Sequence, residues 1–95
     1  MSQADERCVA TVTIVNKLGM HARPAMAFVD LANTFKSTVT VRKGSQAVDG
    51  KSIMQMMMLA ATQGTQIEIT ANGDDASAAL DELVELVKSN FQEDQ

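Results

Sequence analysis

Residues 18–26, with the sequence LGMHARPAM, combine side chains that could carry out group-transfer chemistry. They include His21, the only histidine of the chain, and Pro24, its only proline. A neutral imidazole is a competent nucleophile near pH 7. The guanidinium of Arg23 matches the oxygens of a phosphate group in charge and geometry. These residue types predict a nucleophile beside an anion-binding group.

The residues around His21 indicate how such a site would be positioned. Gly19 can turn the backbone sharply at little steric cost, and Pro24 suits the first turn of a helix. If His21 lies near the N-cap, the amides of Ala22 and Arg23 are among the free donors of that turn. These donors and the helix dipole favour an anion, so the helix start at Ala22, Arg23 and Pro24 would cradle a phosphate.

Two interpretations of His21 follow from the residues alone. As a nucleophile at an anion-binding helix start, it would carry a phosphoryl group and leave it open to a second acceptor. No carboxylate dyad, metal-ligand cluster or second histidine accompanies it, which favours a carrier over a hydrolase. The alternative is that His21 is a capping or loop residue and Arg23 a solvated surface charge, as most such residues are.

Length and composition limit the class of protein. A chain of 95 residues holds a single domain, residues 1–95, in which we expect residues 1–7 to be frayed. The net charge of −4 argues against a nucleic-acid surface. We find no apolar run long enough for a membrane span and no signal peptide, so a cytoplasmic protein is expected. The one cysteine, Cys8, excludes an internal disulfide and is interpreted as a small apolar residue at a strand start.

Hydrophobic periodicity predicts the order β-α-β-β-α-β-α. Gly64 is expected to end the second helix, and Asp74 or Asp75 to cap the third. Strands with one apolar face imply a mostly antiparallel sheet covered by helices on one side, and the pattern alone suggests a ferredoxin-like topology. The predicted strands are residues 9–16, 37–43, 46–48 and 65–71, and the predicted helices are residues 22–35, 52–63 and 74 or 75 to 91.

The segment Gly19-Met20-His21-Ala22-Arg23-Pro24-Ala25 resembles the phosphorylation-site motif of HPr, the histidine-containing phosphocarrier of the bacterial phosphoenolpyruvate:sugar phosphotransferase system. The resemblance continues through Lys51-Ser52-Ile53-Met54 and through Gly64-Thr65-Gln66-Ile67-Glu68-Ile69, and it covers residues 8–91. It implies an α+β open-faced sandwich, in which a four-stranded antiparallel sheet of order 1-4-2-3 carries three helices on one face.

The resemblance also implies a function. Enzyme I, charged by phosphoenolpyruvate, would transfer a phosphoryl group to Nδ1 of His21, and an acceptor IIA domain would then take it. Arg23 and the amides of the helix start would stabilise the phosphorylated form. Such a protein is a carrier rather than an enzyme, needs no cofactor or metal, binds no nucleic acid or membrane, and is expected to be a monomer.

The second helix supports two interpretations of Ser52. With Gln55 three residues later, Ser52 forms the sequence of a capping box, which explains the serine by stability alone. In some HPr proteins the matching serine is phosphorylated by HPr serine kinase/phosphorylase, so Ser52 is also a candidate for this modification. The added charge would weaken docking of acidic partners.

Methionines crowd the same helix, and they cannot all be buried. Met56, Leu59 and Ala60 are expected to form a buried set with Ile53, which leaves Met54 and Met57 near the surface. Methionine adapts to differently shaped partners. The resemblance implies that Ile53, Met54 and Met57 belong to the apolar patch that docks enzyme I and IIA domains. We expect Met20 and Met26, which flank His21, to extend this patch.

The resemblance leaves the branch of the phosphotransferase system open. Residues 16–26 are close to the nitrogen-branch carrier, whereas the second helix is more similar to HPr of the sugar branch. Two other functions are alternatives: a regulatory HPr paralogue that acts by binding proteins, and a small acyl-phosphate hydrolase on a ferredoxin-like fold. A hydrolase would turn over its substrate, whereas a carrier would be labelled stoichiometrically at His21.

Overall fold

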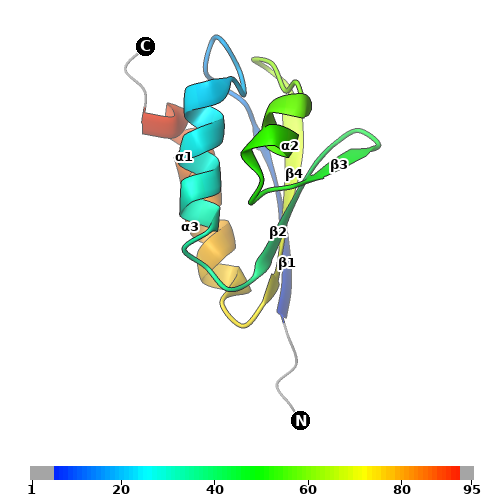
Figure 1. Cartoon of the computed structure of the whole chain (residues 1–95), viewed down its shortest axis with the longest axis vertical. Helices are drawn as coiled ribbons and strands as arrows, with labels where there is room; N and C mark the ends of the chain where they lie inside the picture. The colour runs from blue at the N-terminus through cyan, green and yellow to red at the C-terminus, as the bar shows by residue number, and fades with distance from the viewer. Residues whose placement is uncertain (1–5, 93–95) are drawn as a thin grey trace.

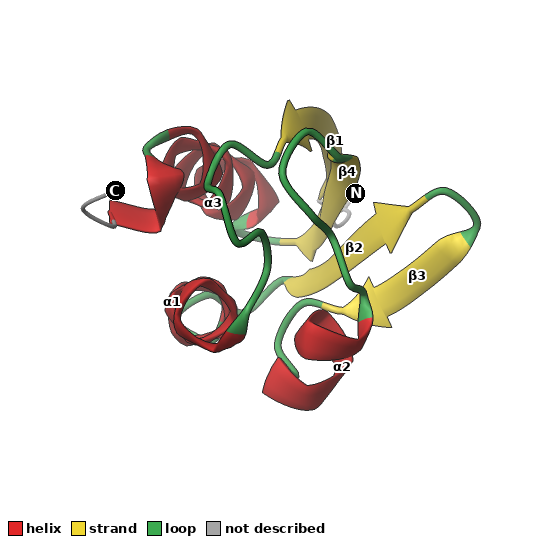
Figure 2. Ribbon diagram, turned by 90° about the horizontal axis from the view of Figure 1, so that it is seen from above, coloured by secondary structure: helices red, strands yellow, loops and turns green. Residues whose placement is uncertain are grey.

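The computed structural model describes residues 6–92 and forms a single sheet with helices on one face (Figures 1 and 2). The predicted fraying of residues 1–5 lies outside the described residues. Glu6 and Arg7, also expected to be frayed, instead belong to the first strand and pair with Gly73 and Asn72. In chain order the elements are β1 (Glu6–Thr13), α1 (Ala22–Ala32), β2 (Thr38–Lys43), β3 (Gln46–Asp49), α2 (Ile53–Met58), β4 (Gln66–Gly73), α3 (Ala76–Lys88) and the 3₁₀ turn η1 (Asn90–Gln92).

The strands are antiparallel in the order β1-β4-β2-β3, as the HPr resemblance implied. The ferredoxin-like topology suggested by the pattern alone is wrong. The predicted order of helices and strands along the chain is compatible with the ferredoxin-like sheet and with the observed sheet. Only the long-range pairing of the strands distinguishes the two topologies. Here β4, the last strand in sequence, lies between β1 and β2, with Ile69 opposite both Ala10 and Val41.

The core lies between the sheet and the helices, and it is built from the alternating residues that the sequence predicted. Each strand turns one alternating set of mostly apolar side chains towards the helices, and the other set faces away from the core. Phe28 of α1 and Leu83 of α3 are fully buried against this face. The inward residues of the sheet include Val12, Ile14, Val39, Val41, Ile67, Ile69 and Ala71.

Helix α1 ends at Ala32 rather than at residue 35. Side chains after Ala32 take over the backbone acceptors: Asn33 Nδ2 donates to Val29 O at 3.0 Å and Thr34 Oγ1 to Leu31 O at 2.7 Å. Asn and Thr compete with the backbone in this way and are poor helix formers. Phe35, the last residue of the predicted helix, is half-buried outside the observed one.

Helix α2 is six residues long and ends at Met58, although the pattern extended it to residue 63. Ala60 adopts a left-handed conformation with φ +54°, and it is exposed rather than part of the predicted buried set. Beyond it, Ala61 O accepts a hydrogen bond from Met20 N at 2.7 Å. Gly64 is also left-handed, with φ +88°, but its N–H donates to Ile14 O instead of closing α2. Pairing with the segment before His21 therefore outweighs the helix propensity of the two alanines.

Helix α3 ends at Lys88, earlier than the predicted residue 91. Asp75 occupies its N-cap position, but the carboxylate accepts from Lys36 N, Ser37 N and Ser37 Oγ and makes no cap bond. After the helix, Phe91 has φ +55° and is 4% exposed, so the left-handed turn returns its ring to the core.

Candidate functional site

His21 is the N-cap residue of α1, as the sequence predicted. Its backbone is extended, with φ −94° and ψ −166°, and its carbonyl accepts the first helical hydrogen bond from Ala25 N at 2.9 Å. The residue is half-exposed. The imidazole therefore lies at the positive end of an 11-residue helix.

The loop before His21 is a tight turn fixed on both sides. Asn16 is 1% exposed and its Nδ2 donates to Gly19 O at 2.7 Å, while Gly19 N returns a bond to Asn16 O at 3.1 Å. Gly19 has φ +68°, and a Cβ there would lie 2.7 Å from the Cα of Thr62. Only glycine fits this position, because the backbone after α2 passes directly beside it.

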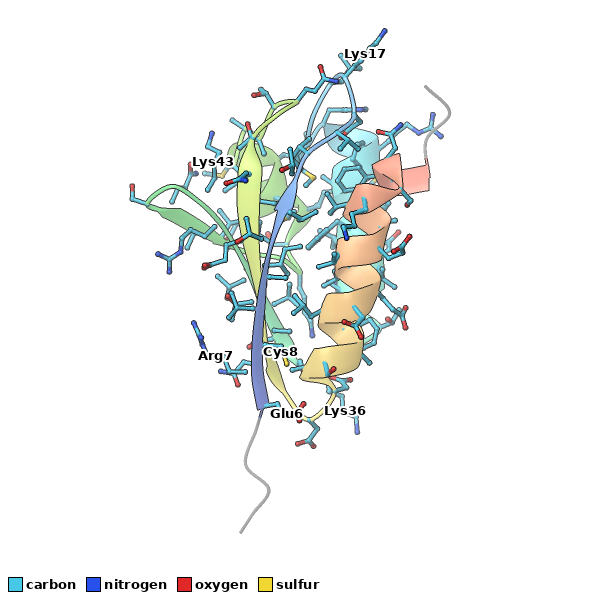
Figure 3. All side chains as sticks on the ribbon, turned by 180° about the vertical axis from the view of Figure 1, so that it is seen from behind. Glu6, Arg7, Cys8, Lys17, Lys36 and Lys43 are labelled. Carbon is cyan, nitrogen blue, oxygen red and sulfur yellow. The ribbon has the colours of Figure 1, made fainter. Side chains whose placement is uncertain are left out.

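The first turn of α1 is suited to an anion. The N–H groups of Ala22 and Arg23 precede the point at which intrahelical bonding begins. Pro24 has no N–H to satisfy, and its ring is fully buried, which anchors the turn to the core. The first turn holds no acidic residue, and the side chain of Arg23 is exposed. Lys17 lies at the tip of the preceding loop (Figure 3).

The two ring nitrogens of His21 differ in accessibility. Nε2 is buried. A group transferred from another protein must reach a nitrogen from solvent. The burial of Nε2 therefore favours Nδ1 as the nucleophilic atom.

The predicted docking residues fall into two groups. Met20 is 4% exposed and belongs to the core, so its assignment to a surface patch is wrong. It flanks His21 in sequence, but the turn at Gly19 directs it inward. Met26, Met54 and Met57 are 50%, 73% and 46% exposed, and Ile53 is half-buried. These four lie on α1 and α2, which pack against each other (Figure 2).

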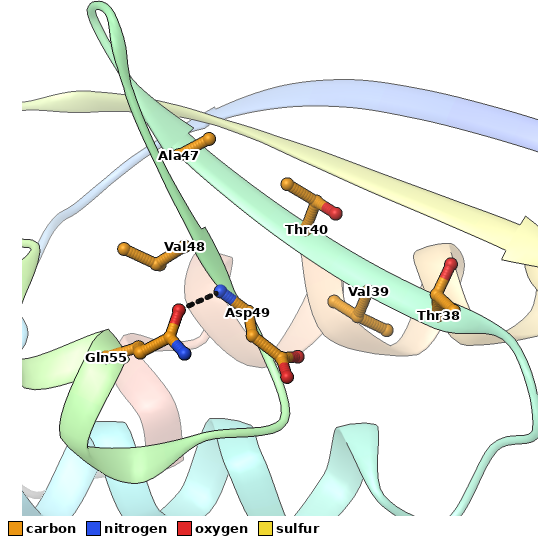
Figure 4. Close-up of a pocket in the computed structure, with 7 residues that line it drawn as sticks. All are labelled: Thr38, Val39, Thr40, Ala47, Val48, Asp49 and Gln55. Carbon is orange, nitrogen blue, oxygen red and sulfur yellow. Dashed lines mark hydrogen bonds between the residues drawn. The ribbon is translucent and has the colours of Figure 1, made fainter.

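Ser52 is the N-cap of α2, and its Oγ accepts from Gln55 N at 3.3 Å. Only this half of the predicted capping box forms. Gln55 Oε1 accepts from Asp49 N at 2.9 Å (Figure 4) instead of from Ser52 N. The reason is that Ser52 N already donates to Asp49 O. The bond from Asp49 to Gln55 lies in a pocket of about 310 Å³ that holds none of the proposed site residues.

Sequence reasoning missed the residues that hold α2 in place. Lys43 Nζ donates to Ala60 O at 3.2 Å and Gln46 Nε2 to Met58 O at 3.4 Å, so the β2–β3 hairpin satisfies carbonyls at the C-terminal end of α2. At the other end, Lys51 Nζ donates to Phe35 O at 2.7 Å. These bonds join residues distant in sequence, and no local pattern predicts them. Asn16 carried a local signal, since Asn before a tight turn commonly bonds its own backbone.

Residues 6–92 contain neither a cluster of metal ligands nor a helix suited to a membrane. This part of the chain brings together no three His, Cys, Asp or Glu side chains that could hold a metal ion. It also has no helix with the length and apolar character required to cross a bilayer.

Comparison with known proteins connects this geometry to a family. The model of the PTS HPr component phosphorylation site matches residues 9–89. The chain is 51% identical over 83 residues to the phosphocarrier protein HPr of Pseudomonas putida, covering 86% of this chain and 92% of that protein. It is 49% identical over 85 residues to the phosphocarrier protein NPr of Proteus mirabilis, covering 87% and 93%.

The chain belongs to the HPr family. HPr-C-His from Thermoanaerobacter tengcongensis has the same fold, with a TM-score of 0.89 and 42% identity over 93% of this chain and 99% of that one. HPr proteins are phosphocarriers of the phosphotransferase system, and the matched region contains His21 and all of α1 and α2. Similar identity to an HPr and to an NPr accords with the mixed character of the two motifs in the sequence.

Proposed function

We propose that this protein accepts a phosphoryl group from enzyme I on Nδ1 of His21 and passes it to a IIA domain, in the bacterial cytoplasm. The observation that carries the proposal is the position of His21. It is half-exposed at the N-cap of α1, and the first turn that follows holds Arg23 and no acidic residue. Membership of the HPr family supports the same assignment.

The proposed step is a displacement at phosphorus. The lone pair of Nδ1 attacks the phosphoryl group carried by enzyme I, an N–P bond forms on His21, and the bond between phosphorus and the donor atom of enzyme I breaks. The phosphoryl oxygens then lie beside the amides of Ala22 and Arg23 and within reach of the guanidinium. These groups stabilise charge that bulk water would otherwise solvate.

Onward transfer requires that the phosphoryl group is held but not hydrolysed. The first turn of α1 offers donors and a cation, and it holds no carboxylate that could activate a water molecule. The protein therefore acts as a carrier without turnover of its own. An incoming IIA domain meets the same exposed face from which enzyme I departs.

Docking is assigned to the apolar surface formed by Met26, Ile53, Met54 and Met57. Three of these side chains are about half exposed or more, and α1, which begins directly after His21, packs against α2. Flexible methionines can repack against both enzyme I and IIA domains, which have different shapes.

The test is the intact mass of the protein after incubation with phosphoenolpyruvate and a bacterial enzyme I. We expect a gain of one phosphoryl group that is acid-labile and absent in His21→Ala. Failure to gain it with the enzyme I of the same organism would contradict the proposal. Steady release of inorganic phosphate from an acyl phosphate, without a labelled protein, would instead favour the hydrolase.

The branch of the system is tested by discharge. The labelled protein is mixed with a sugar-branch IIA domain or a nitrogen-branch IIA domain, and the loss of label is followed in time. Faster discharge by one of them identifies the branch. Loss of label to neither would contradict transfer to IIA domains.

Regulatory phosphorylation of Ser52 stays a prediction. In the free protein the Oγ of Ser52 caps α2, so the modification would replace a neutral acceptor with a charged one beside Met54. Incubation with ATP and HPr serine kinase should add one acid-stable phosphoryl group, lost in Ser52→Ala. An unchanged mass would contradict the prediction.

A further inference from the structure

The methionines of the described chain divide sharply by exposure. Two are core residues, Met20 at 4% and Met56 at 0%. The other four are among the most exposed apolar side chains: Met26 at 50%, Met54 at 73%, Met57 at 46% and Met58 at 66%. Methionine is ordinarily a buried residue, so this exposed set calls for a separate explanation.

Three of the four exposed methionines share one side of α2. Met54, Met57 and Met58 follow the spacing i, i+3 and i+4, which places them together on the outer side of α2. Met56 lies on the opposite side, in the core. Met26 belongs to α1, the helix that packs against α2.

Among residues 6–92, these thioethers are the oxidisable side chains most exposed to solvent. The chain has no Trp and no Tyr, and its one cysteine, Cys8, is half-buried in β1. Figure 3 shows Cys8 at the end of the sheet opposite to the loop that holds Lys17. Exposed methionine is converted to methionine sulfoxide, and reductases reverse the reaction.

We propose that Met26, Met54, Met57 and Met58 form a reversible methionine-oxidation site that controls docking, with hydrogen peroxide as the oxidant. The sulfur lone pair attacks one peroxide oxygen, the O–O bond breaks and an S–O bond forms. The sulfur loses two electrons, and the peroxide is reduced to water. A dithiol-dependent sulfoxide reductase reverses the step, releasing the oxygen as water while two thiols become a disulfide.

Because four methionines are exposed and two are buried, oxidation should be selective for the exposed ones. Oxidation of the four exposed sulfurs removes no core contact, so the fold persists. The core sulfurs of Met20 and Met56 are shielded from peroxide. The modified surface, however, carries polar S–O groups where apolar side chains stood. Burying such a group without a hydrogen-bond partner is unfavourable, so partners bind less tightly.

This consequence rests on the proposed function, and it predicts a specific kinetic change. Because His21 is untouched, the kcat of enzyme I with the oxidised protein as phosphoryl acceptor should be nearly unchanged. The KM for this protein should rise about tenfold or more, as expected when an unpartnered polar group is buried. Treatment with a methionine sulfoxide reductase should restore the original KM.

The experiment begins with graded hydrogen peroxide, peptide mass mapping and circular dichroism. We expect one added oxygen on each of the four exposed methionines, with Met20 and Met56 unmodified and the spectrum unchanged. Oxidation of the core methionines at the same rate, or loss of the folded spectrum, would overturn the selective site.

A matched variant separates sulfur chemistry from other peroxide damage. The chain carrying Met26→Leu, Met54→Leu, Met57→Leu and Met58→Leu presents apolar side chains without thioethers, and its own KM before treatment is the reference. Its KM should not change with peroxide. A KM of the original protein that stays constant after mapped oxidation would overturn this inference alone. No labelling of the untreated protein would overturn the proposed function and, with it, control of docking.

Discussion

At the residue scale, the site depends on where a few backbone groups point. His21 is a nucleophile candidate because its carbonyl starts α1, which leaves the first N–H groups of the helix beside it without intrahelical acceptors. Arg23 adds the only charged side chain in that first turn. The proposed phosphoryl transfer therefore depends on residues 21–23, and the preceding turn must hold this segment in place.

Arg23→Ala should slow phosphoryl transfer from enzyme I while labelling of His21 still reaches completion. One hydrogen bond to a charged group contributes about 1.5–3 kcal/mol, so the expected reduction in rate is roughly tenfold to hundredfold. Rapid-quench measurement of the labelling rate tests this. Arg42→Ala, a change on the exposed face of β2, is the control. Equal rates for the original protein and Arg23→Ala would show that the guanidinium does not act at the site.

Gly19→Ala should destabilise the protein and distort the site. An L-residue in the left-handed region costs about 1–2 kcal/mol, and the added Cβ would also collide with the backbone of Ala61 and Thr62. Gly44→Ala is the matched control, since Gly44 has φ +60° but no atom lies within 4 Å of an added Cβ. Urea unfolding should show the larger loss for Gly19→Ala. Equal losses would mean that the close approach to Ala61 has no energetic weight.

At the scale of elements, α2 is a helix that other segments hold in shape. Six residues are too few for a stable isolated helix. Ser52 satisfies a donor at its start, and Lys43 and Gln46 satisfy carbonyls near its end. The outer side of α2 can therefore remain apolar and exposed, because hydrogen bonds at its ends and Met56 beneath it maintain the conformation.

Ser52→Ala should lower the free energy of unfolding by about 1 kcal/mol, the usual effect of removing a helix N-cap. Ser77→Ala is the control, because Ser77 is exposed within α3 and alanine favours helix. Urea denaturation of both variants at neutral pH makes the comparison. If Ser52→Ala is as stable as the original protein, the cap bond at 3.3 Å makes no net contribution.

At the scale of the whole molecule, hydrogen bonds between residues far apart in the sequence hold the loops at the two ends of the sheet. At the end near His21, Ile14 N donates to Thr65 O and Gln63 Nε2 to Val15 O, which fastens the loop before α1 to the start of β4. At the other end, the Asp75 carboxylate accepts hydrogen bonds from Lys36 N and from the N–H and hydroxyl of Ser37. Neither connection follows from local pattern.

The hydrogen bonds to the Asp75 carboxylate predict that the stability of the protein falls in acid. The hydroxyl of Ser37, followed by the amides of Lys36 and Ser37, lowers the pKa of Asp75 from 3.8 to about 2. Because the folded-state pKa is depressed, the stabilisation is fully present above pH 3.8 and disappears as the pH falls towards and below 2. Asp75→Asn should thus be less stable at neutral pH and lose less stability than the original protein between pH 4 and pH 2, both pH limits being approximate.

Urea unfolding at several pH values tests this window. Asp74→Asn, at the exposed neighbouring carboxylate, should keep the pH profile of the original protein. If Asp75→Asn and the original protein lost stability in parallel through this range, the hydrogen bonds to Asp75 would not be the source of the acid sensitivity.

Local sequence predicted the order of the elements and the turn that places His21 at the start of α1. Alternating apolar residues predicted the strands, the i, i+3, i+4 spacing predicted the helices, and Gly19, His21 and Pro24 predicted the strand-to-helix turn, because each is a short-range property of the chain. The motif at residues 19–25 was sufficient for the resemblance to the HPr family, which the comparisons then showed.

Tertiary structure alone decided the strand order that pattern reasoning would have mistaken, the early end of α2, and the burial of Met20. In each case a long-range contact outweighed a local preference: β4 inserted between β1 and β2, and Ala61 paired with Met20 instead of extending a helix. A sequence window records the propensity of its own residues, but the free energy of such pairings depends on partners far away in the sequence.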